Sequence, residues 1–245
     1  MWDHVGISAS DRDATRRFYE PLLSILGHEL HSSGQYDEWN DFATAQARDE
    51  RPVTRNLHVA FVARSRDDVD AFWRTGVEAG YTSDGEPGER PQYSESYYGA
   101  FLLDPDGNSA EAVHHAEPRT GDNVIDHLWI GVRDLDATRR FYESIVPALG
   151  FRIARGSDER FHVVGGGRSF ALVQDGRPPT ESLHCAFSAA DDATVDAFHE
   201  AATAAGYEDN GAPGERPQYH AGYYGAFVLD PDGSNVEAVH HNRPG

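Results

Sequence analysis

The sequence has 245 residues, of which 39% are hydrophobic and 11% aromatic, and its formal net charge at pH 7 is -20. This apolar content exceeds that of a disordered chain, and the length suits two compact domains. The chain has no lysine, so every fixed positive side chain is an arginine. The excess of negative charge argues against nucleic acid as a partner, because it repels phosphate. It is typical either of a strongly hydrated surface or of a protein that attracts a cationic ligand.

The sequence also carries no signal for a membrane or for disulfide chemistry. No apolar run approaches the roughly 20 residues that a membrane span needs. The first four residues contain neither a basic nor an apolar leader. We therefore expect a cytoplasmic protein without a membrane partner. Cys185 is the single cysteine, which excludes internal disulfides and thiolate clusters and favours a small buried core residue.

Two copies of the same motifs follow one another along the chain. The repeated segments are 13–20 with 136–143, and 87–93 with 213–219. This repeat predicts two domains, at residues 1–117 and 123–245. The boundary between them is placed in a polar stretch with proline and glycine, and residues 118–122 are interpreted as a linker.

Each predicted domain contains two units with the same order of elements. The first unit begins with an apolar strand at residues 5–8 and continues into a helix that opens near Asp11 and stops at Gly27. Its later strands are harder to recognise and are expected within residues 36–47. The corresponding elements of the second copy are a strand at 128–132, a helix between Asp134 and Gly150, and later strands within 161–173.

The second unit is predicted to begin with a strand at residues 57–63. A helix follows, with Ser65 as its capping residue and Gly80 at its end. Strands at 97–103 and 110–113 then close the unit, joined by an Asp-Pro-Asp-Gly-Asn turn. The repeat therefore predicts an α+β protein of four βαβββ modules.

Histidines and glutamates recur at fixed places in these modules. Each module has a histidine on its first strand, and each even module has a glutamate on its last strand: His4, His58, His127, His184, Glu111 and Glu237. Side chains alternate along a strand, so His58 points away from Val59 and Phe61, which we expect to face the helix. Two imidazole nitrogens and one carboxylate oxygen form the donor set that non-haem iron and related divalent ions accept, with coordination positions left open.

These strand histidines, the Tyr-Tyr-Gly-Ala-Phe strand at 97–101 and the turn at 104–108 resemble the vicinal-oxygen-chelate superfamily. That superfamily includes glyoxalases, bleomycin-resistance proteins and extradiol dioxygenases. The resemblance covers nearly the whole chain and implies two cupped barrels. It also implies a divalent metal ion in each half, with Fe(II) favoured and Zn, Ni or Mn as alternatives. The implied ligand sets are His4, His58 and Glu111 in the first half, and His127, His184 and Glu237 in the second.

The resemblance implies that the ion holds two adjacent oxygens of a small-molecule substrate. Glyoxalase-type isomerases have a fourth ligand, an acid near the end of each odd module. Here the stretches 42–47 and 169–174 contain no carboxylate, although Gln46 or Gln174 could coordinate weakly. A three-ligand site favours a dioxygenase. The alternatives are a glyoxalase-like lyase or isomerase acting on a dicarbonyl adduct, and a metal-free protein that sequesters a cationic drug.

The chain departs from the extradiol pattern at its candidate catalytic groups. The family's tyrosine, ten residues before the glutamate, is replaced by Phe101 and Phe227. Tyr97 and Tyr223 share a face with these phenylalanines by strand alternation, so they are candidate replacements.

A second candidate catalytic group occurs in one half only. His220 stands near the place of the family's acid-base histidine, whereas the first copy has Ser94, which cannot titrate near neutral pH. We therefore expect the second half to carry most of any oxygenase activity. Four further histidines are expected beyond the last strands, at exposed ends: His114, His115, His240 and His241. The protein is expected to be a monomeric pseudo-dimer or a homodimer.

Overall fold

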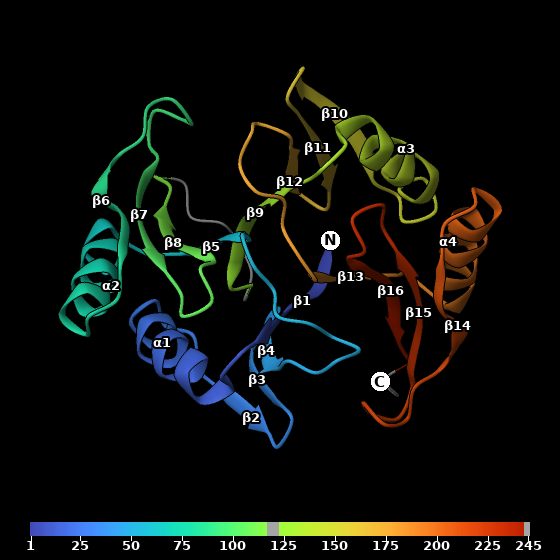
Figure 1. The fold of residues 1–245 in the computed structure, drawn as a ribbon, viewed down its shortest axis with the longest axis horizontal. Coiled ribbons are helices and arrows are strands. Elements are labelled where there is room, and N and C mark those ends of the chain that lie inside the picture. Colours follow the sequence, from blue (N-terminus) through green and yellow to red (C-terminus); the bar gives the residue numbers. More distant parts are fainter. Residues whose placement is uncertain (117–122, 243–245) are drawn as a thin grey trace. The chain divides into compact units, whose positions relative to one another are not determined.

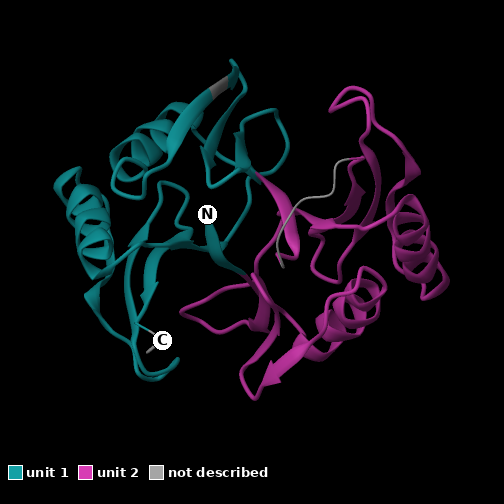
Figure 2. Ribbon diagram, turned by 180° about the vertical axis from the view of Figure 1, so that it is seen from behind, with its two compact units in different colours: residues 1–5, 130–245 teal, residues 6–129 magenta. Residues whose placement is uncertain are grey.

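The computed structural model describes residues 1–116 and 123–242. The predicted linker, residues 118–122, lies outside the described residues. The chain divides into two compact units (Figure 2). Unit 1 comprises Met1–Val5 and Ile130–Gly245, and unit 2 comprises Gly6–Trp129. The first five residues thus cluster with the second half of the chain, and the start of the second half clusters with the first.

Four modules with one order of elements follow along the chain (Figure 1). The first contains β1 (Trp2–Ala9), α1 (Arg12–Ile25), β2 (His31–Ser33), β3 (Tyr36–Trp39) and β4 (Phe42–Gln46). The second contains β5 (His58–Val62), α2 (Arg66–Glu78), β6 (Ser83–Glu89), β7 (Tyr98–Leu103) and β8 (Ser109–His114). The third contains β9 (Ile125–Gly131), α3 (Leu135–Ile145), β10 (Arg152–Ser157), β11 (Arg160–Gly165) and β12 (Arg168–Val173). The fourth contains β13 (His184–Ser188), α4 (Asp192–Ala204), β14 (Asp209–Glu215), β15 (Tyr223–Leu229) and β16 (Asn235–His241).

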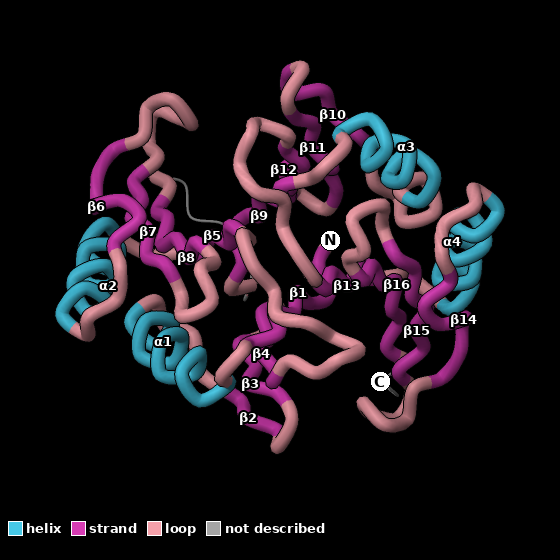
Figure 3. The backbone as a smooth tube through the Cα atoms, in the orientation of Figure 1, coloured by secondary structure: helices cyan, strands magenta, loops and turns pink. Residues whose placement is uncertain are grey.

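The helices begin where the sequence predicts. Asp11, Ser65 and Asp134 each accept a hydrogen bond from the backbone N–H three residues later, which satisfies a donor at the helix N-terminus. The apolar stripe of α1 is buried, with Phe18 and Leu22 at no more than 1% exposure. Each helix lies beside strands of its own module (Figure 3), so one face of those strands is covered and the other remains for a site.

The second strand of each module was not located from the sequence. In the even modules it is β6 or β14, whose sequences are Ser-Asp-Gly-Glu-Pro-Gly-Glu and Asp-Asn-Gly-Ala-Pro-Gly-Glu. Both lack apolar alternation and contain proline and glycine, which are signals of a loop. They nevertheless pair with β7 and β15, with register shifts at their glycines, because an edge strand tolerates such irregularities.

The strand order within each unit decides which side chains meet. Two eight-stranded sheets contain the neighbouring strands β6-β7-β8-β5-β9 and β14-β15-β16-β13-β1. The central strand β5 runs parallel to β8 and antiparallel to β9, so Ala60 is paired with both Glu111 and His127. In unit 1, β13 pairs with β16 in the same parallel register, with Ala186 opposite Glu237.

The buried core includes Cys185, at 2% exposure, as the sequence predicts. Among the described residues, no helix is long and apolar enough to cross a membrane.

Candidate metal centres

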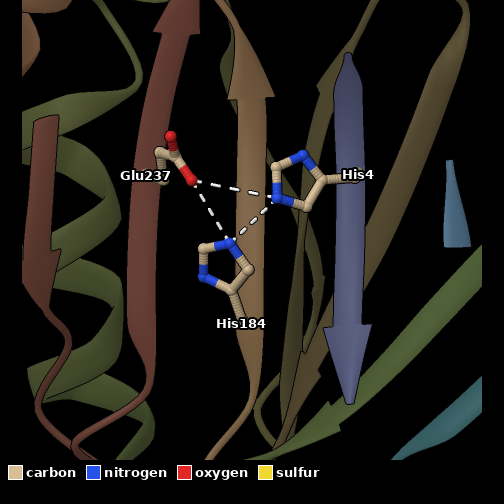
Figure 4. A group of neighbouring side chains, drawn as sticks. All are labelled: His4, His184 and Glu237. Carbon is tan, nitrogen blue, oxygen red and sulfur yellow. Dashed lines mark hydrogen bonds and ion pairs between the residues drawn. The ribbon is translucent and has the colours of Figure 1, made fainter. Parts of the chain in front are cut away.

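Three predicted ligands meet on the open face of unit 1. His4 comes from β1, His184 from β13 and Glu237 from β16, and their side chains point toward one another (Figure 4). His4 Nε2 lies 3.0 Å from His184 Nε2, and Glu237 Oε2 lies 3.2 Å from His184 Nε2 and 3.9 Å from His4 Nε2. The glutamate is buried and both histidines are partly buried.

Unit 2 contains a second group with the same composition. His58 comes from β5, Glu111 from β8 and His127 from β9. Glu111 Oε2 lies 3.0 Å from His58 Nε2 and 3.6 Å from His127 Nε2. In each of the two groups, all three potential ligand atoms lie within 4.8 Å of one another. All six predicted ligand residues therefore belong to one group or the other.

The predicted division of these residues into two triads is wrong. The family resemblance implied a group of His4 with His58 and Glu111, but the structure groups His4 with the second-half residues His184 and Glu237. His127 correspondingly joins the first-half residues. The reason is strand order, because β1 is the neighbour of β13 and β9 is the neighbour of β5. The first strands of the two odd modules are exchanged relative to the prediction.

The spacing of these donor atoms fits a divalent ion. An ion about 2.0–2.2 Å from nitrogen and oxygen ligands separates two neighbouring octahedral ligands by roughly 3 Å. The separations of 3.0 and 3.2 Å around His184 match that edge, and the 3.9 Å between Glu237 Oε2 and His4 Nε2 lies between the separations of neighbouring and opposite ligands. The buried carboxylate of Glu237 also faces two imidazoles and a phenol, none of which carries a fixed positive charge. A cation between the three groups would compensate the cost of burying the carboxylate.

The second carboxylate oxygen of each glutamate accepts a hydrogen bond from a predicted catalytic tyrosine. Tyr97 Oη donates to Glu111 Oε1 at 2.6 Å, and Tyr223 Oη donates to Glu237 Oε1 at 2.5 Å. Burial, followed by the charge of the neighbouring carboxylate, raises the pKa of both tyrosines far above the ordinary value. Both hydroxyls therefore stay protonated, and each holds its glutamate with Oε2 directed toward the histidines.

Two glycines that the sequence analysis did not single out lie against these carboxylates. A Cβ atom added at Gly225 would lie 2.8 Å from Glu237 Oε1 and 3.1 Å from a ring atom of Tyr223. At Gly99 the same atom would collide with the carboxylate of Glu111. The repeated Tyr-Tyr-Gly-Ala-Phe segment contained the signal, since a strand glycine marks a close approach of another group.

The outer nitrogen of His4 is the start of a chain of polar contacts. Asp3 Oδ2 lies 2.9 Å from His4 Nδ1, and its Oδ1 lies 2.7 Å from His241 Nε2. His241 Nδ1 lies 2.8 Å from Nε2 of His220, the predicted acid-base histidine. Burial opposes ionisation of Asp3, yet its contacts with His4 and His241 hold its pKa below the usual value. An anionic Asp3 accepts the Nδ1 proton of His4 and leaves Nε2 for a metal.

Unit 2 has a shorter version of this chain. Asp126 Oδ1 lies 2.8 Å from His127 Nδ1, and Asp126 Oδ2 lies 3.4 Å from His115 Nε2. Ser94 stands at the repeat position of His220, so a third imidazole does not occur there. The predicted difference between the two copies, His220 in one and Ser94 in the other, thus lies at the end of these contacts that is farthest from the ligands.

The prediction of exposed ends for four histidines is wrong. All four are partly buried: His114, His115, His240 and His241. The last strands extend further than predicted, since β8 includes His114 and β16 ends at His241. His115 and His241 turn toward the aspartates beside the candidate ligands, whereas His240 contacts Asp192.

The glutamines considered as weak ligands have a different role. Gln46 accepts from the backbone N–H of Arg12 and donates to the carbonyls of Ala9 and Ser10. Gln174 accepts from the N–H of Leu135 in the same way. Both side chains connect strand ends to helix starts through hydrogen bonds, so the prediction that these glutamines could coordinate a metal is wrong.

The phenylalanines that replace the family's tyrosine lie beside the histidines. The ring centroid of Phe101 is 5.9 Å from that of His58, and Phe227 is 6.4 Å from His184. In the strand register these phenylalanines stand opposite Glu111 and Glu237. They line the site but offer no hydroxyl.

A known family model matches both halves of the chain. The model of the Glyoxalase/Bleomycin resistance protein/Dioxygenase superfamily matches residues 2–112 and again residues 124–238. The chain belongs to this superfamily. The resemblance inferred from the sequence motifs and the α+β fold of βαβββ modules are therefore confirmed. No curated protein matches the chain.

Solved structures give the same fold. Glyoxalase I from Zea mays matches with a TM-score of 0.66 and 20% identity, covering 98% of this chain and 92% of that one. A putative dioxygenase from Bacillus subtilis subsp. subtilis str. 168 matches with a TM-score of 0.64 and 13% identity, covering 100% of this chain and 86% of that one. At these identities the similarity concerns the fold alone.

Proposed function

We propose that this protein is a metal-dependent enzyme, similar to the dioxygenases of its superfamily, with a small-molecule substrate that binds the ion through two adjacent oxygens. The observation that carries the proposal is the number of protein ligands in each candidate group. Each consists of three residues on three neighbouring strands of the described chain. Six-coordinate iron with three protein ligands keeps three open positions, enough for a bidentate substrate and dioxygen. We therefore favour Fe(II) over Zn, Ni or Mn.

The residues around each group have separate roles in this proposal. A bound ion supplies Lewis-acid stabilisation of negative charge on the substrate oxygens. Tyr97 and Tyr223 hold the glutamate ligands through their hydroxyls. Asp3 and Asp126 orient the imidazoles of the histidines that follow them.

Elemental analysis of protein purified without chelator tests this function, combined with the electronic spectrum of its nitric oxide adduct. We expect bound iron and turnover of a catechol-like substrate. Activity restored by nickel or zinc on a dicarbonyl adduct would instead identify a lyase or isomerase. Protein that binds no metal, yet retains a cationic drug, would identify a sequestering protein.

His220 supplies a further test, because it is proposed as the acid-base group of the unit 1 site. In a Glu111→Ala background, which leaves only the unit 1 centre intact, His220→Ala should leave metal content unchanged and lower turnover by about a hundred- to ten-thousand-fold. Ser94→His is the matched variant in unit 2, and it should not reduce activity. Normal turnover in His220→Ala would contradict this role.

A further inference from the structure

The two candidate metal centres have the same ligands but different aromatic neighbours. At the unit 2 centre, Trp129 lies two residues after His127 on β9 and directly opposite His58 on β5. Side chains two apart on a strand, and side chains opposite each other across an antiparallel pair, share one face of the sheet. The indole of Trp129 therefore lies on the same face as both histidines, and it is only partly buried.

A second aromatic ring lies next to this indole. The ring centroid of Tyr93 is 6.1 Å from that of Trp129 and 5.1 Å from that of Tyr97. Tyr97 in turn donates a hydrogen bond to the ligand Glu111. Tyr93 therefore lies between Trp129, which is opposite His58, and Tyr97, which contacts Glu111. Tyr93 is 51% exposed, which is the highest exposure among the large hydrophobic side chains of the described residues. These two rings place apolar, solvent-accessible surface beside a polar site.

The repeat provides an internal comparison. Tyr219 repeats Tyr93 and lies 4.9 Å from Tyr223 in unit 1. The repeat position of Trp129, however, is occupied by Gly6, which has no side chain. The fold does not require an indole at this strand position, because the other copy forms the same strand without it.

We propose that Trp129 and Tyr93 form a contact surface for a planar, conjugated part of the substrate at the unit 2 centre. This inference rests on the proposed function, in which the ion holds two adjacent substrate oxygens. A ring attached to those oxygens packs against the indole next to His58. The unit 2 centre then selects aromatic substrates. The unit 1 centre has no indole two residues after its ligand His4, so it discriminates less between aromatic and non-aromatic substrates.

The test compares two chelators that bind a metal through two adjacent oxygens. Tropolone has a planar conjugated ring, whereas acetohydroxamate has none. Zinc-loaded protein with His184→Ala keeps the unit 2 centre and avoids redox chemistry. In this background Trp129→Gly, which introduces the residue of the other copy, should weaken tropolone binding about two- to tenfold, the usual contribution of one aromatic pair. Acetohydroxamate binding and the amount of bound zinc should change by less than about twofold.

Two further variants complete the measurement by titration calorimetry. Trp129→Phe keeps an aromatic ring and should restore most of the tropolone affinity even if Trp129→Gly perturbs the strand. Glu111→Ala leaves only the unit 1 centre, which should prefer tropolone less strongly. Equal losses for both chelators, or no loss for tropolone, would overturn the aromatic contact while leaving the proposed function intact. Failure of both chelators to bind the zinc-loaded protein would overturn the proposed function together with this inference.

Discussion

At the scale of single residues, the position of each glutamate ligand depends on a missing side chain. Gly225→Ala would place a methyl group 2.8 Å from Glu237 Oε1, closer than such atoms approach in proteins. The carboxylate must move, so we expect metal affinity of the unit 1 centre to fall about ten- to a hundredfold. Gly34→Ala is the matched control, because nothing lies within 4 Å of a Cβ atom there. Competition with a zinc chelator measures both, and equal affinities would contradict the role of Gly225.

The ligand residues themselves were predictable because each has a simple sequence signal. A histidine at the start of a strand and a glutamate after an Asp-Pro-Asp-Gly turn are visible in one copy and repeated in the other. The contacts of Asp3 with His4 and of His241 with Asp3 were not predicted. The second of these contacts joins residues at opposite ends of the chain, and no periodicity in the sequence connects such positions.

At the scale of elements, helices and inner strands were predictable because burial imposes periodicity on them. The strands β6 and β14 were not, since their exposed residues carry no such pattern. The division of the six ligands between two centres could not be predicted from the sequence either. His4 and His127 occur in equivalent strands of equivalent modules, so a repeat pattern is satisfied by either grouping. Hydrogen bonding between strands decides between them.

The turn before β16 makes the stability of this element depend on pH. Burial raises the pKa of Asp230 to about 6. The folded chain therefore retains this proton at a pH where the unfolded chain has lost it. Protonated Asp230 therefore adds about 2–3 kcal/mol to the free energy of unfolding below pH 4, and this contribution is lost as the pH rises through 6.

Asp230→Asn tests this effect, because an amide oxygen can still accept from the N–H groups of Asp232 and Ser234. The difference in unfolding free energy between the variant and the natural chain should grow in favour of the variant from pH 4 to pH 7. Urea denaturation at several pH values measures it. A difference that stays constant with pH would show that the carboxyl group titrates alike in both states.

At the scale of the whole molecule, the compact units and the predicted domains divide the ligands differently. Residues 1–117 contain His58 and Glu111 but lack β9 and therefore His127. Residues 6–129 contain all three. We expect fragment 6–129 to bind one metal ion and fragment 1–117 to bind it at least tenfold more weakly, the usual cost of disrupting a metal site. Metal retention after gel filtration distinguishes the fragments, and equal retention would argue that β9 contributes nothing.

Paired substitutions in the full chain decide which residues share an ion. The natural chain should bind one ion at each of its two candidate groups. His4→Ala with Glu237→Ala removes two ligands of one group, so one ion per chain should remain. His4→Ala with Glu111→Ala removes a ligand from each group, and binding at both should be strongly weakened because each retains only two protein ligands. Elemental analysis with a protein assay gives the stoichiometry. The opposite result, one ion kept by the second variant and none by the first, would mean that His4 and Glu111 do not belong to separate centres.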